Sequence, residues 1–101
     1  MEIKNDNSDV IFSDNSLKLL VFKSSWCGPC KILNPIIDEI IINNLELDVY
    51  KIDVDNNPII CEKYGIRNIP TTLFLKDKEI VDKFVGTQPQ EFIQDKIDRL
   101  K

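Results

Sequence analysis

The segment Trp26–Lys31, read as Trp-Cys-Gly-Pro-Cys-Lys, constrains this chain more than any other, because its two cysteines lie where a strand pattern gives way to a helix pattern. Leu17–Phe22 before it is an apolar run of strand length, and apolar residues recur behind it at helical spacing. On a helix, residues i and i+3 share one face with Cβ atoms about 5–6 Å apart. Cys27 and Cys30 can therefore close a disulfide with little rearrangement.

The start of the predicted helix favours ionisation of the first thiol. Unpaired backbone N–H groups and the positive end of the helix dipole stabilise a thiolate at that position. Thiols in such settings have pKa values of roughly 3.5–7.5, against about 8.5 for a free cysteine. We therefore expect Cys27 to be the nucleophile and Cys30 the resolving thiol of a redox pair.

Cysteine and histidine content argues against a metal site. A structural zinc site usually takes four cysteine or histidine ligands, whereas this chain has three cysteines and no histidine. The third cysteine, Cys61, has two interpretations. It is a small core residue, since free cysteine is among the most buried residue types, or it is a regulatory thiol open to oxidation.

Length and charge bound the class of protein. A chain of 101 residues is large enough for one core, so we expect a single domain over residues 1–101. The net charge of −4 argues against nucleic-acid binding, which needs basic patches. The apolar runs are far shorter than the ~20 residues of a membrane span, and the polar N-terminus lacks the pattern of a signal peptide. We expect a cytoplasmic monomer that binds neither nucleic acid nor membranes.

Strand and helix patterns alternate along the chain. The expected strands are Glu2–Lys4, Leu17–Phe22, Leu47–Val54, Thr71–Lys76 and Glu79–Val85, and the expected helices are Asp9–Ser13, the segment from the cysteines to Asn43-Asn44, the segment from Pro58 to Gly65, and Gln90–Leu100. The order is β-α-β-α-β-α-β-β-α. It predicts an α/β fold with a mixed sheet of about five strands and helices on both faces.

Local signals set the details of these elements. The long helix has an apolar stripe of Ile32, Leu33, Ile36, Ile37, Ile40 and Ile41. Pro35 lies inside it and should kink it, because proline lacks an N–H and clashes with the preceding turn. Asn57 is a candidate N-cap before Pro58, and Gly65 a candidate C′ residue. The Asp77-Lys78 turn lacks glycine, so one non-glycine residue there should adopt a positive φ.

Trp-Cys-Gly-Pro-Cys-Lys in a chain of this order resembles the thioredoxin family. Pro35 lies five residues past Cys30, like the helix proline of the family. The segment Lys63–Thr71 resembles the second family signature, in which Ile69-Pro70 would be a cis peptide facing the redox pair. Val85-Gly86 matches the glycine before the last helix. The resemblance covers the chain from about Leu19 onward and implies a thioredoxin fold.

The resemblance also implies the chemistry and the partners. The dithiol would reduce disulfides of protein substrates, and a flavin-dependent thioredoxin reductase would restore it, with no cofactor held by the chain itself. Gly28-Pro29 resembles the reducing members of the superfamily. The implied substrate-binding residues are Trp26, Gly28, Pro29, Ile69, Pro70 and Gly86. Ile69 would act through its main chain, pairing with the bound segment like an added strand. Trp26 could instead be ordinary surface packing.

The sequence departs from the family beneath the cysteines. Val21 occupies the position of a buried aspartate that serves the second cysteine in thioredoxins, and Lys23 follows on the same face of the strand. We hypothesise that Lys23, paired with Asp53 on the neighbouring strand, lowers a thiol pKa. Alternatively, Lys23 extends into solvent at the strand end. Lys51, whose family counterpart faces the missing aspartate, would need another acceptor.

Three functions remain open at this point. The first is a general protein-disulfide reductase, which the intact cysteines and docking residues favour. The second is a thioredoxin-fold binding subunit in which the thiols are secondary. The third is a dedicated reductant of a single partner, which Val21 and Lys23 make worth considering.

Overall fold

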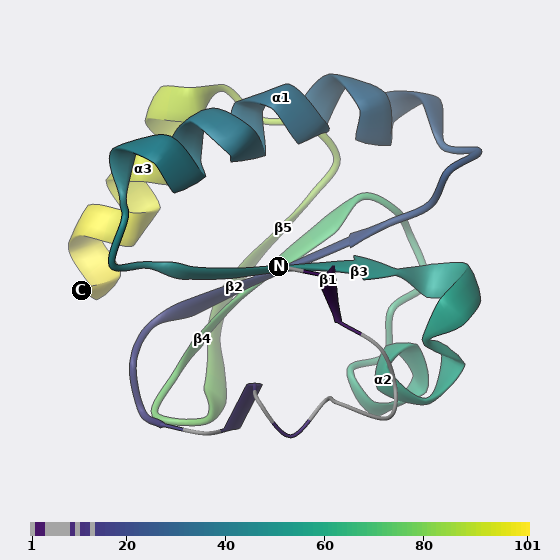
Figure 1. Ribbon diagram of the computed structural model, residues 1–101, viewed down its shortest axis with the longest axis horizontal. Coiled ribbons are helices and arrows are strands. Elements are labelled where there is room, and N and C mark those ends of the chain that lie inside the picture. Colours follow the sequence, from purple (N-terminus) through teal and green to yellow (C-terminus); the bar gives the residue numbers. More distant parts are fainter. Residues whose placement is uncertain (1, 4–8, 10, 13) are drawn as a thin grey trace.

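The computed structural model describes residues 2–3, 9, 11–12 and 14–101 and shows one mixed sheet flanked by helices (Figure 1). The elements follow the predicted order closely. They are β1 (Glu2–Ile3), β2 (Lys18–Lys23), α1 (Gly28–Asn43), β3 (Asp48–Asp53), a 3-10 turn (Val54–Asn56), α2 (Pro58–Lys63), β4 (Thr71–Lys76), β5 (Glu79–Val85) and α3 (Gln90–Leu100). The helix predicted over 9–13 falls on a segment that includes residues outside the described part.

The sheet has the strand order β1-β3-β2-β4-β5. Strands β1, β3 and β2 are parallel, whereas β4 is antiparallel to both β2 and β5. These directions bring four chain segments to one edge of the sheet: the ends of β2, β3 and β5 and the start of β4. The cysteine motif follows β2 and the cis-proline signature precedes β4. The redox and docking residues predicted from these two segments therefore lie at this edge.

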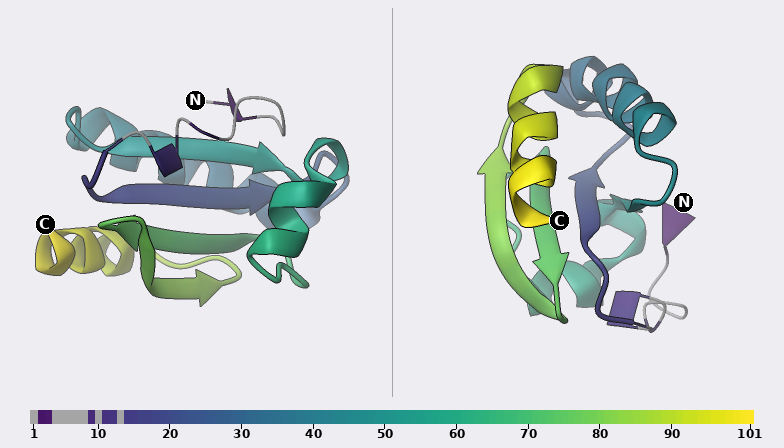
Figure 2. Two further views of the ribbon diagram at one scale, coloured as in Figure 1. Left: turned by 90° about the horizontal axis from the view of Figure 1, so that it is seen from below. Right: turned by 90° about the vertical axis from the view of Figure 1, so that its left-hand side faces the viewer.

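Helices cover both faces of the sheet (Figures 1 and 2). Alternate residues of β2 point to opposite faces. Leu19 and Val21 pack in the core beneath α1 and α3, whereas Leu20 and Phe22 pack in the core on the α2 side. Burial on both faces explains why β2 reads as a continuous apolar run.

Helix α1 buries a narrower stripe than the sequence predicts. Leu33, Ile37 and Ile40 are buried, and Ile36 and Ile41 pack against the same core. The prediction is wrong for Ile32, which is 63% exposed. Its position, one residue before Leu33, turns it about 100° around the helix axis from that buried side chain.

Both ends of α1 lie near the predicted positions. The helix ends at Asn43, and the buried side chain of Asn44 donates to the carbonyl oxygen of Ile40 at 2.8 Å. The same amide exchanges hydrogen bonds with Gln94 of α3. This pair fixes the two helices to each other. Pro35 lies within α1, and the kink remains a prediction.

The structure corrects two predictions about turns: the capping bond of Asn57 before α2, and the number of residues with positive φ between β4 and β5. Asn57 occupies the N-cap position of α2, but its side chain makes no capping bond and instead donates to the carbonyl oxygen of Asp53 at 2.8 Å. Gly65 has a φ of +64°, as its C′ position requires. Asp77 and Lys78 both have positive φ, at 54° and 69°, where one residue was expected. Positive φ at both central positions is the pattern of a type I′ turn, whose twist matches that of the flanking strands.

Candidate active site

The cysteine pair lies at the start of α1, directly after β2. Cys27 and Cys30 form a disulfide with their Cα atoms 5.3 Å apart. Cys27 is the N-cap residue of α1, and its Sγ accepts a hydrogen bond from the backbone N–H of Cys30 at 3.2 Å. The first turn of α1 carries no acidic residue. A thiolate on Cys27 would therefore meet a backbone donor and the positive end of the helix dipole.

Burial does not distinguish the two cysteines. Each is 5% exposed. The expected difference in role consequently rests on position, because Cys27 lies at the helix terminus and accepts the capping bond, whereas Cys30 lies within the first turn.

Trp26 is an exposed aromatic side chain held in place by a hydrogen bond. It is 67% exposed, and its indole Nε1 donates to Oδ2 of Asp55 at 2.9 Å. Asp55 follows β3 and is a site residue that sequence reasoning missed, because only the sheet brings the end of β3 beside the cysteine motif. The bond favours a fixed docking surface over incidental packing.

Two further loops meet the cysteine loop at this edge. The Ile69–Pro70 peptide is cis, as the resemblance implies. The backbone N–H of Gly86 donates to the carbonyl oxygen of Pro70 at 2.8 Å. The hydroxyl of Thr87 donates to the carbonyl oxygen of Pro29 at 3.2 Å. Gly86 has a φ of +85°, which L side chains rarely adopt. The structure thus brings together all the residues predicted to contact substrate.

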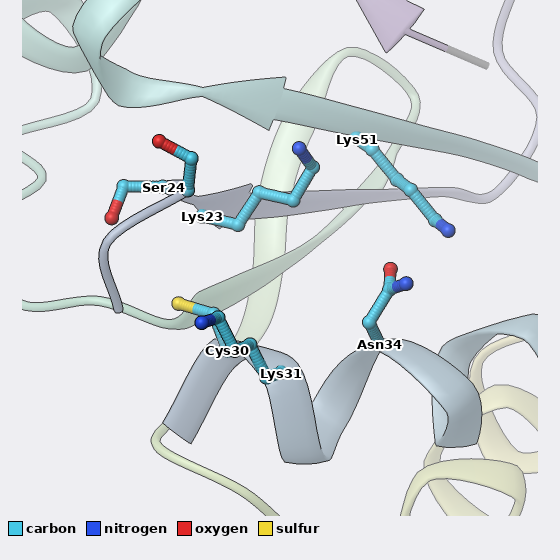
Figure 3. A pocket seen from close by; sticks show the side chains of 7 residues that line it. Lys23, Ser24, Cys30, Lys31, Asn34 and Lys51 are labelled. Atoms are coloured by element: carbon cyan, nitrogen blue, oxygen red, sulfur yellow. The ribbon is translucent and has the colours of Figure 1, made fainter. Parts of the chain in front are cut away.

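A polar pocket of about 370 Å³ lies between the start of α1 and the ends of β2 and β3 (Figure 3). Its lining includes Lys23, Ser24, Cys30, Lys31, Asn34 and Lys51. Val21, at the position of the family's aspartate, is 4% exposed and belongs to the apolar core under α1. Lys51 pairs with Asp38 of α1, with Nζ and Oδ1 2.6 Å apart. Asp38 is therefore the alternative acceptor that Lys51 was expected to need.

Lys23 is half-buried and lines the same pocket as Cys30. Asp53 is its register neighbour on β3, which places the two residues side by side as the hypothesis requires. The Asp53 carboxylate also accepts the backbone N–H of Asp55 at 2.9 Å, so it caps the turn after β3. The ion pair between Lys23 and Asp53 and its effect on a thiol remain predictions.

Cys61 packs on the α2 side of the sheet. It is half-buried against the core there. Burial raises the pKa of its thiol, and the charges of Asp53 and Asp55 add to the effect. A thiol that resists ionisation reacts slowly, so these observations favour the core interpretation of Cys61. Within the described part of the chain, no cluster of three or more acidic or cysteine residues is arranged to hold a metal ion.

The fold and this site define a class of proteins that exchange thiols and disulfides through a cysteine pair at a helix start. The chain belongs to the thioredoxin family, whose family model matches residues 1–99. It is 41% identical over 96 residues to a thioredoxin of Chlorobaculum thiosulfatiphilum, covering 94% of this chain and 88% of that protein. It is 40% identical over 87 residues to a thioredoxin of Staphylococcus epidermidis, covering 85% and 84%.

A solved structure shows the same fold. A mutant thioredoxin from Halobacterium salinarum NRC-1 superposes with a TM-score of 0.89 at 33% identity, covering 98% of this chain and 88% of that one. This protein is accordingly a protein disulfide oxidoreductase. Thioredoxins need no cofactor of their own, because the cysteine pair is the redox group. Among the described helices, none has the length and apolar character needed to cross a membrane.

Proposed function

We propose that this protein acts as a reductase of protein disulfides, with Cys27 as nucleophile and Cys30 as resolving thiol. The observation that carries this assignment is the position of Cys27 Sγ, which caps α1 and accepts the backbone N–H of Cys30. Such a setting stabilises the thiolate, which is the attacking species in exchange. Gly28-Pro29 between the cysteines supports the reducing direction through its resemblance to reducing members of the family.

The proposed reaction has two exchange steps. The Cys27 thiolate attacks one sulfur of a substrate disulfide, that disulfide breaks, and the other substrate sulfur leaves as a thiolate. The thiolate of Cys30 then attacks Cys27 Sγ in the mixed disulfide and releases the second substrate thiolate. Two electrons pass to the substrate, and the Cys27–Cys30 disulfide remains. A flavin-dependent thioredoxin reductase then supplies two electrons to restore the dithiol.

The proposed docking surface surrounds the pair. Trp26 presents an exposed ring fixed by Asp55. Hydrogen bonds also join Gly86 to Pro70 and Thr87 to Pro29. Gly28 has open space around its Cα, so a substrate chain can approach the tip of the cysteine loop. The main chain of Ile69 would pair with an extended substrate segment.

We assign the tuning of the thiols to the lysines behind them. Lys23 shares a pocket with Cys30, and Lys51 borders it from β3. Positive charge near a thiol favours its ionised form. Asp53 would orient Lys23 from the neighbouring strand. We expect the protein to work as a monomer in the cytoplasm, where the prevailing reducing conditions keep thiols reduced.

Trapping of the mixed disulfide tests the assignment of roles. Cys30→Ser removes the resolving thiol, so this variant should accumulate a covalent adduct with a disulfide-bearing protein through Cys27. Cys27→Ser should form none. Mass spectrometry of the linked peptides identifies the sulfur involved. An adduct that forms through Cys30 in Cys27→Ser, at a rate equal to that of Cys30→Ser, would overturn the assignment.

A further inference from the structure

Thr72 of β4 is a fully buried residue whose hydroxyl has no hydrogen-bond partner in the described part of the chain. The residue is 0% exposed, and Oγ1 contacts neither a donor nor an acceptor there. The neighbouring Thr71 is buried as well, but its hydroxyl donates to the carbonyl oxygen of Asn68. A buried hydroxyl without a partner costs free energy, because it has given up its hydrogen bonds to water. The Thr72 hydroxyl therefore needs an explanation.

The strand register places Thr72 on the face of the sheet that α1 covers. Thr72 is the antiparallel partner of Val21 on β2, and Val21 belongs to the core beneath α1 and α3. Directly opposed residues of antiparallel strands point to the same face, with Cβ atoms about 4.5–5.5 Å apart. On the other side of β2, Val21 is the register neighbour of Lys51. Lys51, Val21 and Thr72 therefore form a row across β3, β2 and β4.

This row lies beneath the start of α1, where Cys30 is located. Lys51, at one end of the row, lines the same pocket as Cys30. Figure 3 shows Cys30 on the first turn of α1, above the ends of the strands that carry Lys23 and Lys51. Thr72, at the other end of the row, is the second residue of β4, two positions after Pro70. The cysteine loop meets the sheet at this end of β4.

Cys30 needs a hydrogen-bond donor when it ionises. In the proposed resolving step the thiolate of Cys30 attacks Cys27 Sγ, yet Cys30 is only 5% exposed. Burial disfavours the charged form of a thiol, and a hydrogen bond to that form favours it. The side chain of Val21 is apolar and cannot donate, whereas the hydroxyl of Thr72 beside it can. In the disulfide the Cys30 sulfur is neutral and bonded to Cys27, so this state does not need the donor.

We propose that the Thr72 hydroxyl donates a hydrogen bond to the thiolate of Cys30 and speeds the resolving step. The hydroxyl keeps its proton, and the thiol proton of Cys30 passes to solvent before the attack. The bond between Cys30 Sγ and Cys27 Sγ forms, the bond from Cys27 to the substrate sulfur breaks, and that sulfur leaves as a thiolate. The hydroxyl then returns to the unpartnered state of the disulfide form. This inference rests on the proposed reductase function, because it concerns the second step of that reaction.

Ellman's reagent, an aromatic disulfide with a coloured leaving thiolate, separates the two steps in a stopped-flow experiment. The fully reduced protein is used in a Cys61→Ala background, so that only the redox pair reacts. Release of the first coloured thiolate reports attack by Cys27 and depends on reagent concentration. Release of the second reports attack by Cys30 on the mixed disulfide and does not.

Two substitutions of Thr72 separate the hydroxyl from the shape of the side chain. Thr72→Val removes the hydroxyl and should raise the pH midpoint of the second phase by roughly 1–2 pH units, the equivalent of one hydrogen bond to a charged group. Below both midpoints the second phase should slow about three- to tenfold, because the higher nucleophilicity of a more basic thiolate offsets part of the loss. Thr72→Ser keeps the hydroxyl and should retain the midpoint of the wild type.

Stability and the surrounding charges provide the controls. Thr72→Val removes a buried hydroxyl that lacks a partner, so the urea midpoint of the oxidised protein should not fall. Thr72→Ser removes a buried methyl group and should be the less stable of the two. The lysines that line the pocket with Cys30, namely Lys23, Lys31 and Lys51, are the same in every variant. The carboxylates next to them, Asp38 and Asp53, are unchanged as well.

The possible outcomes distinguish this inference from the proposed function. A second phase with the same rate and pH midpoint in Thr72→Val and the wild type would overturn the role of the hydroxyl, while the reductase function would stand. A second phase that is slower in Thr72→Ser than in Thr72→Val would overturn it too, because packing would then set the rate. A wild type that releases the first coloured thiolate but not the second would overturn the proposed function and this inference together.

Discussion

At the scale of single residues, the chain departs from its family at the position beneath the cysteine pair where the resemblance to thioredoxins implies a carboxylate. Val21 fills that position with an apolar side chain, and Lys23 lines the pocket beside Cys30. A carboxylate there would accept a proton and oppose a second negative charge. We propose that the positive charge of Lys23, beside Cys30, instead favours the thiolate. This difference would affect the pKa of the thiols and the rate at which Cys30 resolves the mixed disulfide.

Replacement of Lys23 tests this account of thiol ionisation. Lys23→Gln should raise the pKa of Cys27 in the dithiol form by roughly 0.2–0.7, the equivalent of one partly exposed charge contact. Thiolate absorbance across a pH titration measures it, in a Cys61→Ala background that removes the third thiol. Lys78→Gln is the control. A Cys27 titration that Lys23→Gln leaves unchanged would contradict the hypothesis.

Sequence reasoning at this scale succeeded where the residues are neighbours in the chain. The spacing of Cys27 and Cys30 alone indicates a disulfide on a helix, and the signature around Pro70 indicates the cis peptide. The bond from Trp26 to Asp55 and the pairing of Lys51 with Asp38 join residues far apart in the chain. Only the packing of α1 against the parallel strands brings these partners together, so no local pattern encodes them.

At the scale of elements, α1 connects the redox centre to the core. Its first turn holds the cysteines, and its buried side chains anchor it on the sheet through Leu33, Ile37 and Ile40. The apolar pattern predicts the helix well, because apolar residues that recur with a period of 3.6 are typical of an amphipathic helix. The same pattern wrongly predicts that Ile32 is buried. The residue type alone does not distinguish an exposed isoleucine from one in the core.

Two substitutions on α1 compare the contribution of a buried isoleucine to stability with that of an exposed one. Ile37→Ala removes a fully buried side chain and should lower the free energy of unfolding by about 2–5 kcal/mol. Ile32→Ala makes the same chemical change at a site 63% exposed and should change it by less than about 0.5 kcal/mol. Urea denaturation measures both variants. Equal losses would mean that α1 packs on the sheet in a different rotation.

The contact of β5 with α3 gives a pH-dependent contribution to stability. The hydrogen bond from Lys96 lowers the pKa of Asp82, with Nζ and Oδ2 2.7 Å apart. A carboxyl whose pKa is lowered by folding stabilises the fold above its unfolded pKa of about 3.9, and that contribution is lost as the pH falls through the lower folded value.

Asp82→Asn should therefore reduce stability slightly at neutral pH, by less than about 1 kcal/mol for a half-buried pair at the surface. It should also make the free energy of unfolding less dependent on pH below about pH 4. Urea denaturation at several pH values compares it with Asp95→Asn, which alters an exposed pair within α3. A variant that keeps the full acid dependence of the wild type would show that Asp82 does not contribute.

At the scale of the whole molecule, topology assembles the site from segments that are remote in the sequence. Parallel β2 and β3 end, β4 begins and β5 ends at one edge of the sheet. Cys27, Asp55, Pro70 and Gly86 therefore meet although 59 positions separate the first from the last. The order of strands and helices predicted from the sequence contains this arrangement in outline. Sequence reasoning placed Lys23 and Lys51 beneath the cysteines but did not predict the pairing of Lys51 with Asp38, because that ion pair joins β3 to α1.

We propose that Cys27 reduces protein disulfides although the apolar Val21 lies where the resemblance implies a buried carboxylate. Insulin reduction with dithiothreitol as electron source tests it most directly, comparing the wild type with Cys27→Ser. We expect rapid turnover by the wild type and none above background by the variant. A folded, fully reduced wild type that shows no turnover would contradict it and favour a dedicated partner or a binding role, with Val21→Asp as the next variant to assay.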